Sequence, residues 1–130
     1  LSGLIDIGRG LSAVDYHRLL ESRRDFTGRM RALMADIDLL LLPGIGVASP
    51  TIAQMANLGS DQKLFAAVTV PTAPIDNCGM PSITLPAGFT ERGTPLAAQF
   101  VGGDFTEPLV LAAGHAFQRA TGFHTRHPAD

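Results

Sequence analysis

The most informative part of the chain is residues 79–102, which read GMPSITLPAGFTERGTPLAAQFVG. Two short apolar runs, Ser82 to Ala87 and Leu96 to Val101, are separated by a polar segment, Thr90 to Pro95. Apolar runs of this length bounded by Gly, Pro and Thr are typical of β-strands, and the segment between them contains turn-forming residues. The pattern predicts two strands that pair antiparallel.

A long amphipathic helix is predicted upstream, from about Ser12 to Ile37. Ser12 followed by Asp15 resembles a capping box, which marks its start. The apolar residues recur at helical spacing along one stripe, with charged residues opposite. The stripe contains Tyr16, Leu19, Phe26, Met30, Leu33, Met34 and Ile37. Arg23 falls within it, and two interpretations stay open: its stem lies along the core with the guanidinium in water, or it meets a buried partner or a substrate.

A short strand is predicted at Leu39 to Leu42, where a continuous apolar run ends at Pro43 and Gly44. An unbroken run of this kind indicates a strand covered on both faces. A long irregular connection, residues 43–81, follows it, interrupted by a helical turn near Ser60 to Ala67. A connection of this length in a compact domain is usually functional or displaced from its proper neighbour.

The last element is predicted to be a helix from Thr106 to about Ala120, with Thr106 as cap, Glu107 and Pro108 in the first turn, and Gly122 past the end. Its inward stripe is predicted to be Leu109, Ala113, Ala116, Phe117 and Ala120. The fold class is therefore α/β, with an incomplete sheet of about three strands, a long N-terminal helix and a C-terminal helix. Three strands alone leave sheet edges unpaired.

Composition narrows the class of protein. The 130 residues (13.7 kDa) are 45% hydrophobic and carry a formal charge of −2, which predicts one folded domain over residues 1–130 and argues against a nucleic-acid partner. The single cysteine, Cys78, fits a reducing compartment, so we expect a cytoplasmic protein. The longest apolar run, Ile37 to Pro43 interrupted by Asp38, is too short to span a membrane. The chain begins at Leu1, so we expect either processing or a piece of something longer.

A search for catalytic groups finds none. There is no G-x-S-x-G motif, and the one lysine, Lys63, fits a surface position. Gly44-Ile45-Gly46 follows a strand as in a dinucleotide fingerprint, but Pro43 intervenes and no long helix opens after it, so no cofactor is predicted. His124 and His127 lack a third ligand nearby, so no metal is predicted. Cys78 fits a buried small hydrophobe better than a reactive thiol.

Several fragments of the chain nevertheless resemble the C-terminal portion of the amidase signature family. They are Leu11 to Tyr16 with Arg23 beyond, Asp38 to Pro43, Thr72 to Asp76, Gly79 to Phe89, Gly93 to Gly102, Phe105 with Glu107, and Thr121 to His124. Their order and spacing resemble the family along nearly the whole chain. The resemblance implies that this chain completes the family's mixed β-sheet with flanking helices.

The resemblance also implies an enzyme that hydrolyses carboxylic amides or esters through a serine, a second serine in a cis peptide, and a lysine. Those elements lie upstream in the family, so no catalytic residue is carried over to this chain. The resemblance places Gly44, Ile45, Thr72 and Asp76 in the wall of the substrate pocket. Thr69 stands where glutamine-dependent members have an acidic residue, and Asp76 where Asn is commoner, which favours a general amidase acting on a neutral or aryl substrate.

Two hypotheses follow. In the first, the chain is inactive alone and packs on the missing N-terminal catalytic portion of the same protein, so that its exposed apolar surface causes self-association when it is isolated. In the second, it is a standalone, catalytically inactive binding or interaction module with this fold, whose strand edges should then carry charges. The first is favoured because Ser82 to Ala87 carries no charge and Leu96 to Val101 has only Gln99 as a polar residue.

Overall fold

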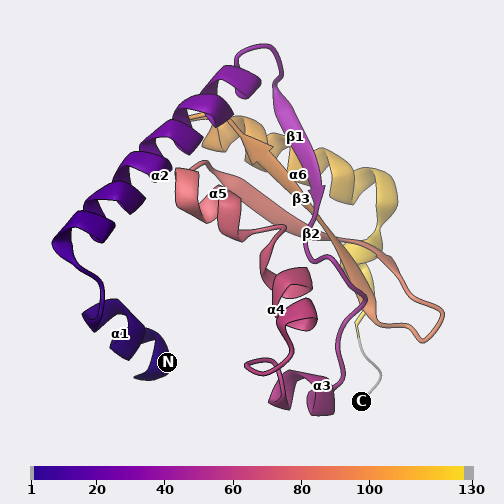
Figure 1. Cartoon of the computed structure of the whole chain (residues 1–130). Helices are drawn as coiled ribbons and strands as arrows, with labels where there is room; N and C mark the ends of the chain where they lie inside the picture. Colours follow the sequence, from indigo (N-terminus) through magenta and orange to yellow (C-terminus); the bar gives the residue numbers. More distant parts are fainter. Residues whose placement is uncertain (1, 128–130) are drawn as a thin grey trace.

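The computed structural model describes residues 2–127 as six α-helices, three strands and one 3-10 turn (Figure 1). In chain order these are α1 (Ser2–Arg9), α2 (Ala13–Met34), β1 (Leu39–Pro43), α3 (Ile52–Ala56), α4 (Gln62–Thr69), α5 (Ala73–Cys78), β2 (Ser82–Phe89), β3 (Pro95–Gly102), α6 (Glu107–Thr121) and η1 (Phe123–Thr125). The mixed α/β architecture agrees with the sequence prediction. No helix among these residues is long and apolar enough to cross a membrane.

The three strands form one antiparallel sheet in the order β1-β3-β2. The β2–β3 hairpin pairs Ser82 with Val101 and Phe89 with Pro95, which confirms the antiparallel pairing expected from residues 79–102. A bulge between Pro86 and Gly88 interrupts the ladder, and Gly88 adopts φ 151° there. β1 pairs with the other edge of β3, so the last strand in sequence is the central strand in space.

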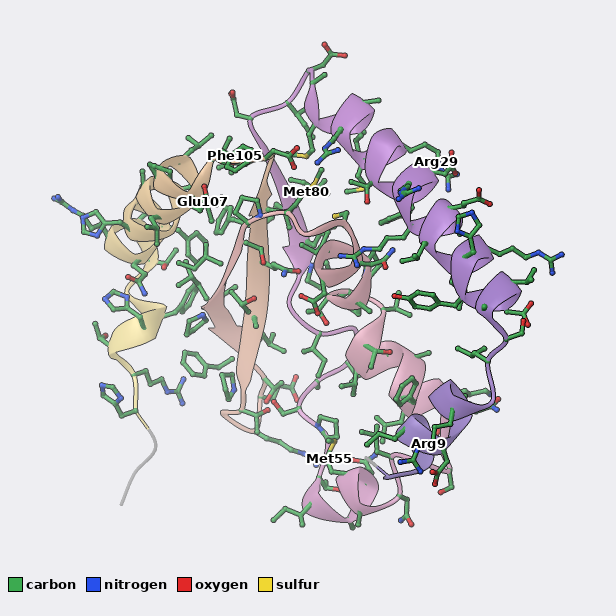
Figure 2. All side chains as sticks on the ribbon, turned by 90° about the vertical axis from the view of Figure 1, so that its left-hand side faces the viewer. Arg9, Arg29, Met55, Met80, Phe105 and Glu107 are labelled. Carbon is green, nitrogen blue, oxygen red and sulfur yellow. The ribbon has the colours of Figure 1, made fainter. Side chains whose placement is uncertain are left out.

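One face of the sheet is covered by α6, and α5 and α2 lie on the other side (Figures 1 and 2). α6 packs closely because Gly114 faces the sheet: a Cβ there would lie 3.1 Å from Ile83 Cδ1 and 3.2 Å from Leu85 Cδ1. The predicted inward stripe is partly wrong. Val110 and Gly114 are the buried residues of α6 and Ala113 and Phe117 are half-buried, whereas three members of the stripe are exposed: Leu109, Ala116 and Ala120.

The buried core lies between the other face of the sheet, α2 and α5. It contains Met34, Ile75, Cys78, Met80 and Val101, with Phe26, Met30, Leu40 and Leu42 packed against it. In the C-terminal half of α2, the stripe residues Phe26, Met30 and Met34 pack on this core as predicted. Tyr16, Leu19 and Leu33, however, are more than half exposed.

The long helix begins as its sequence indicates. Ser12 is the N-cap of α2, and its side chain accepts a hydrogen bond from the Asp15 amide at 3.1 Å. At the other end of the chain, Gly122 terminates α6 with φ 67°, as expected for a C-cap glycine. Thr106 occupies the N-cap position of α6, but its hydroxyl donates to the Gly103 carbonyl at 2.8 Å instead of capping the helix.

Two further expectations are corrected. β1 is not covered on both faces: Leu40 and Leu42 pack on the core, but Leu41 points to the α6 side and is 61% exposed. The connection 43–81 is less irregular than expected: α4 confirms the helical turn near Ser60 to Ala67, but α3 and α5 were not expected. Local caps start two of these short helices, a Thr51–Gln54 capping box for α3 and the Asp61 carboxylate for α4. The helix α1 was not expected either.

Candidate functional site

The residues proposed for a pocket wall come from two places, the loop after β1 and the region of α5. Gly44 follows Pro43, and its amide donates to the Ala97 carbonyl at 2.8 Å. A Cβ at Gly44 would lie 2.7 Å from Ala97 Cβ and 2.9 Å from Thr84 Cγ2, so the backbone passes too close to the sheet for any side chain. Ile45, the next residue, is half-buried.

Thr72 and Asp76 lie at the start and in the middle of α5. The Thr72 carbonyl accepts hydrogen bonds from the amides of Ile75 and Asp76, and its hydroxyl donates to the Thr69 carbonyl at 3.4 Å. Asp76 is exposed, and no ion pair involves it among residues 2–127. The carboxylate of Asp76 is therefore available to a molecule outside this chain.

The helix α4 is hydrogen-bonded both to the loop that contains Gly44 and Ile45 and to the start of α5, where Thr72 and Asp76 lie. The Gly46 amide donates to the Ala67 carbonyl at 2.8 Å, and a Cβ at Gly46 would lie 2.8 Å from that oxygen. Thr69, two residues further along α4, accepts the bond from Thr72. Hydrogen bonds thus join the loop after β1 and the start of α5 to the same end of α4, whereas no hydrogen bond joins Gly44 or Ile45 directly to Thr72 or Asp76.

A surface hollow of about 490 Å³ lies beside this junction. It is lined by Phe26, Thr69, Val70, Ala73, Pro74 and Asn77, so none of its lining side chains is ionisable. Thr69, the position where the resemblance distinguishes glutamine-dependent members, lies in its wall. The four residues predicted for the pocket wall do not line this hollow themselves.

Sequence reasoning missed one polar residue in the sheet. Gln99 on β3 is 4% exposed, and its Nε2 donates to Ser82 Oγ at 3.0 Å. Its Oε1 is buried and accepts no hydrogen bond from any residue that the structure describes. The signal in the sequence was a lone glutamine within an apolar strand.

Arg23, the one charged residue in the predicted apolar stripe of α2, has a backbone partner. Its Nε donates to the Asn77 carbonyl at 2.6 Å in an exposed contact between α2 and α5.

The remaining candidates lie on α4, α5 and η1 and in the loop after β1. Cys78 is buried, and its thiol donates to the Ile75 carbonyl. Lys63 is exposed on α4, and among the side chains that the structure describes, residues 5–127, no hydrogen bond joins a serine hydroxyl to a histidine or lysine. His124 lies in η1, and no group of three or more metal-ligating side chains is found in the described part of the chain. Gly44 and Gly46 lie in the loop after β1, and the next helix along the chain, α3, begins only at Ile52.

Comparison with known proteins gives a consistent result. The family model described as Amidase matches residues 4–111. The putative amidase AmiD of Mycobacterium tuberculosis is 49% identical over 128 residues, which are 98% of this chain and 27% of that protein. A glutamyl-tRNA(Gln) amidotransferase subunit of Enterococcus faecalis is 35% identical over 101 residues, which are 74% of this chain and 19% of that protein.

Solved structures share the fold. The structure of 6-aminohexanoate cyclic dimer hydrolase superposes with a TM-score of 0.79 at 21% identity, covering 91% of this chain and 26% of that enzyme. The chain therefore spans about a quarter of the length of AmiD and of the hydrolase, and about a fifth of the amidotransferase subunit.

Proposed function

This chain belongs to the amidase family, and on that premise we propose that it is the C-terminal portion of an enzyme that hydrolyses carboxylic amides to an acid and ammonia or an amine. The observation that carries the proposal is the family match over residues 4–111, in a chain that spans only 27% of the AmiD relative. In this proposal the serine, the cis-serine and the lysine belong to the upstream portion. Residues 1–130 alone then have no amidase activity.

The upstream portion would pack on surfaces that are apolar and exposed here. Several large apolar side chains on α1, on the first half of α2 and between the two helices are about half exposed or more: Ile5, Ile7, Leu11, Val14, Tyr16 and Leu19. Contiguous apolar patches on a protein surface mark interaction sites, and we expect these side chains to form one. This exposure supports a part of a larger protein over a standalone module. An isolated chain should self-associate, and a monodisperse monomer in light scattering with no binding of an apolar dye would count against the interface.

We further propose a neutral amide as substrate, with Gly44, Ile45, Thr72 and Asp76 in the pocket wall. Support comes from Thr69, which offers no carboxylate to an ammonium group, and from the un-ionisable lining of the adjacent hollow. The greater similarity to AmiD, 49% against 35% for the amidotransferase, agrees with a general amidase. The reducing environment that suits the free Cys78 supports a cytoplasmic enzyme.

The decisive experiment is an assay of ammonia release by the complete protein that contains this chain, using neutral aliphatic and aryl amides beside glutamine. We expect release from the neutral amides and none from residues 1–130 alone. Release by residues 1–130 alone would contradict the placement of the catalytic groups, and activity confined to glutamine would contradict the substrate class.

Asp76 provides a residue-level test of the pocket wall. Asp76→Asn removes a negative charge that would repel a substrate carboxylate. The value of kcat/KM for an amide that carries a carboxylate should therefore rise about tenfold relative to that for a neutral amide, as expected for one charge at short range. Asp25→Asn is the matched control, because Asp25 lies on α2, where it pairs with Arg29 at 3.2 Å. If both variants leave the ratio unchanged, Asp76 does not face the substrate.

A further inference from the structure

The turn between β3 and α6 presents Phe105 to solvent. The Phe105 side chain is 91% exposed, at the end of the sheet where α6 begins (Figure 2). Its φ is 60°, and it is the one non-glycine residue with positive φ in the described part of the chain. Positive φ is unfavourable for a residue with a bulky side chain, and exposure of a whole phenyl ring is unfavourable as well. The native fold thus maintains two unfavourable features at one residue.

The residues around Phe105 prevent the turn from relaxing. The Asp104 carboxylate accepts a hydrogen bond from Arg31 Nε of α2 at 2.6 Å. The Thr106 hydroxyl donates to the Gly103 carbonyl at 2.8 Å, and the Gly102 amide donates to the Pro81 carbonyl at 2.9 Å. Both neighbours of Phe105 are therefore held, and its conformation is imposed by the surrounding structure. Strain imposed in this way is concentrated at functional and binding positions.

A purely local role does not account for the aromatic ring. Phe105 precedes the N-cap Thr106, and an apolar residue at that position often packs against the fourth residue of the helix as a hydrophobic staple. The fourth residue here is Val110, which is 3% exposed against the sheet, while Phe105 is 91% exposed. The staple is therefore not formed. Leu109, one turn along α6, is 39% exposed and extends the apolar surface beside the ring.

We propose that Phe105 is an anchor residue for the upstream catalytic portion of the amidase, its ring inserted into an apolar pocket of that portion alongside α6. The inference rests on the proposed function in one respect, that the chain works within a longer amidase. Two observations favour the upstream portion as the occupant. Phe105 lies inside residues 4–111, which match the family, and in 6-aminohexanoate cyclic dimer hydrolase the part that superposes on this chain is about a quarter of a much longer chain. Buried aromatic anchors dominate the energetics of such contacts.

Two substitutions in the complete protein distinguish an anchor from an exposed, strained residue. Phe105→Leu keeps an apolar side chain, whereas Phe105→Asn removes it but suits positive φ. An anchor predicts that Asn lowers the ratio of folded to unfolded protein about 100-fold or more and that Leu lowers it much less. An exposed residue predicts the reverse order, with Asn equal to the wild type or more stable. That order in urea denaturation would overturn the proposal.

A measurement on the wild type keeps the test valid if the Asn variant does not fold. Hydroxyl-radical footprinting of the complete native protein reports the accessibility of each phenylalanine, with the urea-unfolded protein as the reference for full exposure. We expect oxidation of Phe105 in the native protein to be at least about tenfold slower than in the reference. Oxidation at the unfolded rate overturns the proposal, and so does protection that disappears on dilution, because that result identifies a second copy as the occupant. Neither readout depends on amide hydrolysis, so a complete protein with no amidase activity would refute the proposed function separately.

Discussion

Replacing Gly44 by alanine should destabilise the protein through a clash that can be located atom by atom. The new Cβ would lie 2.7 Å from Ala97 Cβ and 2.9 Å from Thr84 Cγ2. Carbon atoms pack best at about 3.5–4.0 Å, so the loop must move by about 1 Å and lengthen the 2.8 Å bond from the Gly44 amide to the Ala97 carbonyl. We expect a loss of about 1–3 kcal/mol in the free energy of unfolding, the range for overpacked sites.

The assay is urea denaturation of the purified protein, read as a double-mutant cycle. Ala97→Gly removes the nearest atom at a cost of its own of about 0.5–1 kcal/mol. In that background Gly44→Ala should cost at least about 1 kcal/mol less, because the two residues are in direct contact. Gly59→Ala is the control, since a Cβ there has nothing within 4 Å. The reasoning fails if Gly44→Ala leaves stability within about 0.5 kcal/mol of the wild type, or if its cost is the same in both backgrounds.

Two other substitutions are expected to give smaller changes. Gly28→Ala should raise the free energy of unfolding by about 0.5–1 kcal/mol, since Gly28 is inside α2 and a Cβ there meets nothing within 4 Å; a lower urea midpoint would mean that another surface packs on it. Arg126→Gln should cost about 0.5–1 kcal/mol, because the Arg126 guanidinium lies 4.2 Å from the centre of the Phe89 ring; the cost should vanish in a Phe89→Leu background, and its persistence there would exclude a cation–π origin.

The elements that could be predicted from the sequence are those specified by local pattern. The β2–β3 hairpin follows from the turn residues between its strands, the start of α2 from Ser12 and the end of α6 from Gly122, and each of these acts within a few residues of its own position. The end of α2 was less well predicted, because the expected helix continues to Ile37 whereas α2 ends at Met34. The helical turn expected near Ser60 to Ala67 corresponds to α4, whereas α3 and α5 were hidden by a composition rich in Gly, Pro and Thr. The helices α3 and α4 are capped by individual side chains, Thr51 with Gln54 for α3 and Asp61 for α4. The segment has no long series of apolar residues at helical spacing that would indicate a helix.

Burial was harder to predict than secondary structure. α6 is apolar on two adjacent sides, so the periodicity of its sequence could not show which side packs on the sheet. Because α6 approaches the sheet closely at Gly114, Val110 is buried against the sheet and Leu109 remains partly exposed. β1 is apolar throughout, yet its Leu41 has no cover from α6. The link between the loop after β1 and α5 could not be predicted, because it runs through the backbone carbonyls of Ala67 and Thr69, which leave no trace in side-chain chemistry.

The strand order also determines when the sheet can form during synthesis. β3 is the last strand to be translated, yet it provides both pairing edges of the sheet, one for β1 and one for β2. β1 leaves the ribosome more than fifty residues before its partner, since Leu39 pairs with Gly102. Until then the four consecutive leucines of β1 have no strand to pair with, a state open to aggregation and to chaperones. A truncated transcript that ends before β3 would therefore encode β1 and β2 without the strand that both pair with, and no sheet would form. A transcript that ends just after Gly102 would still encode all three strands.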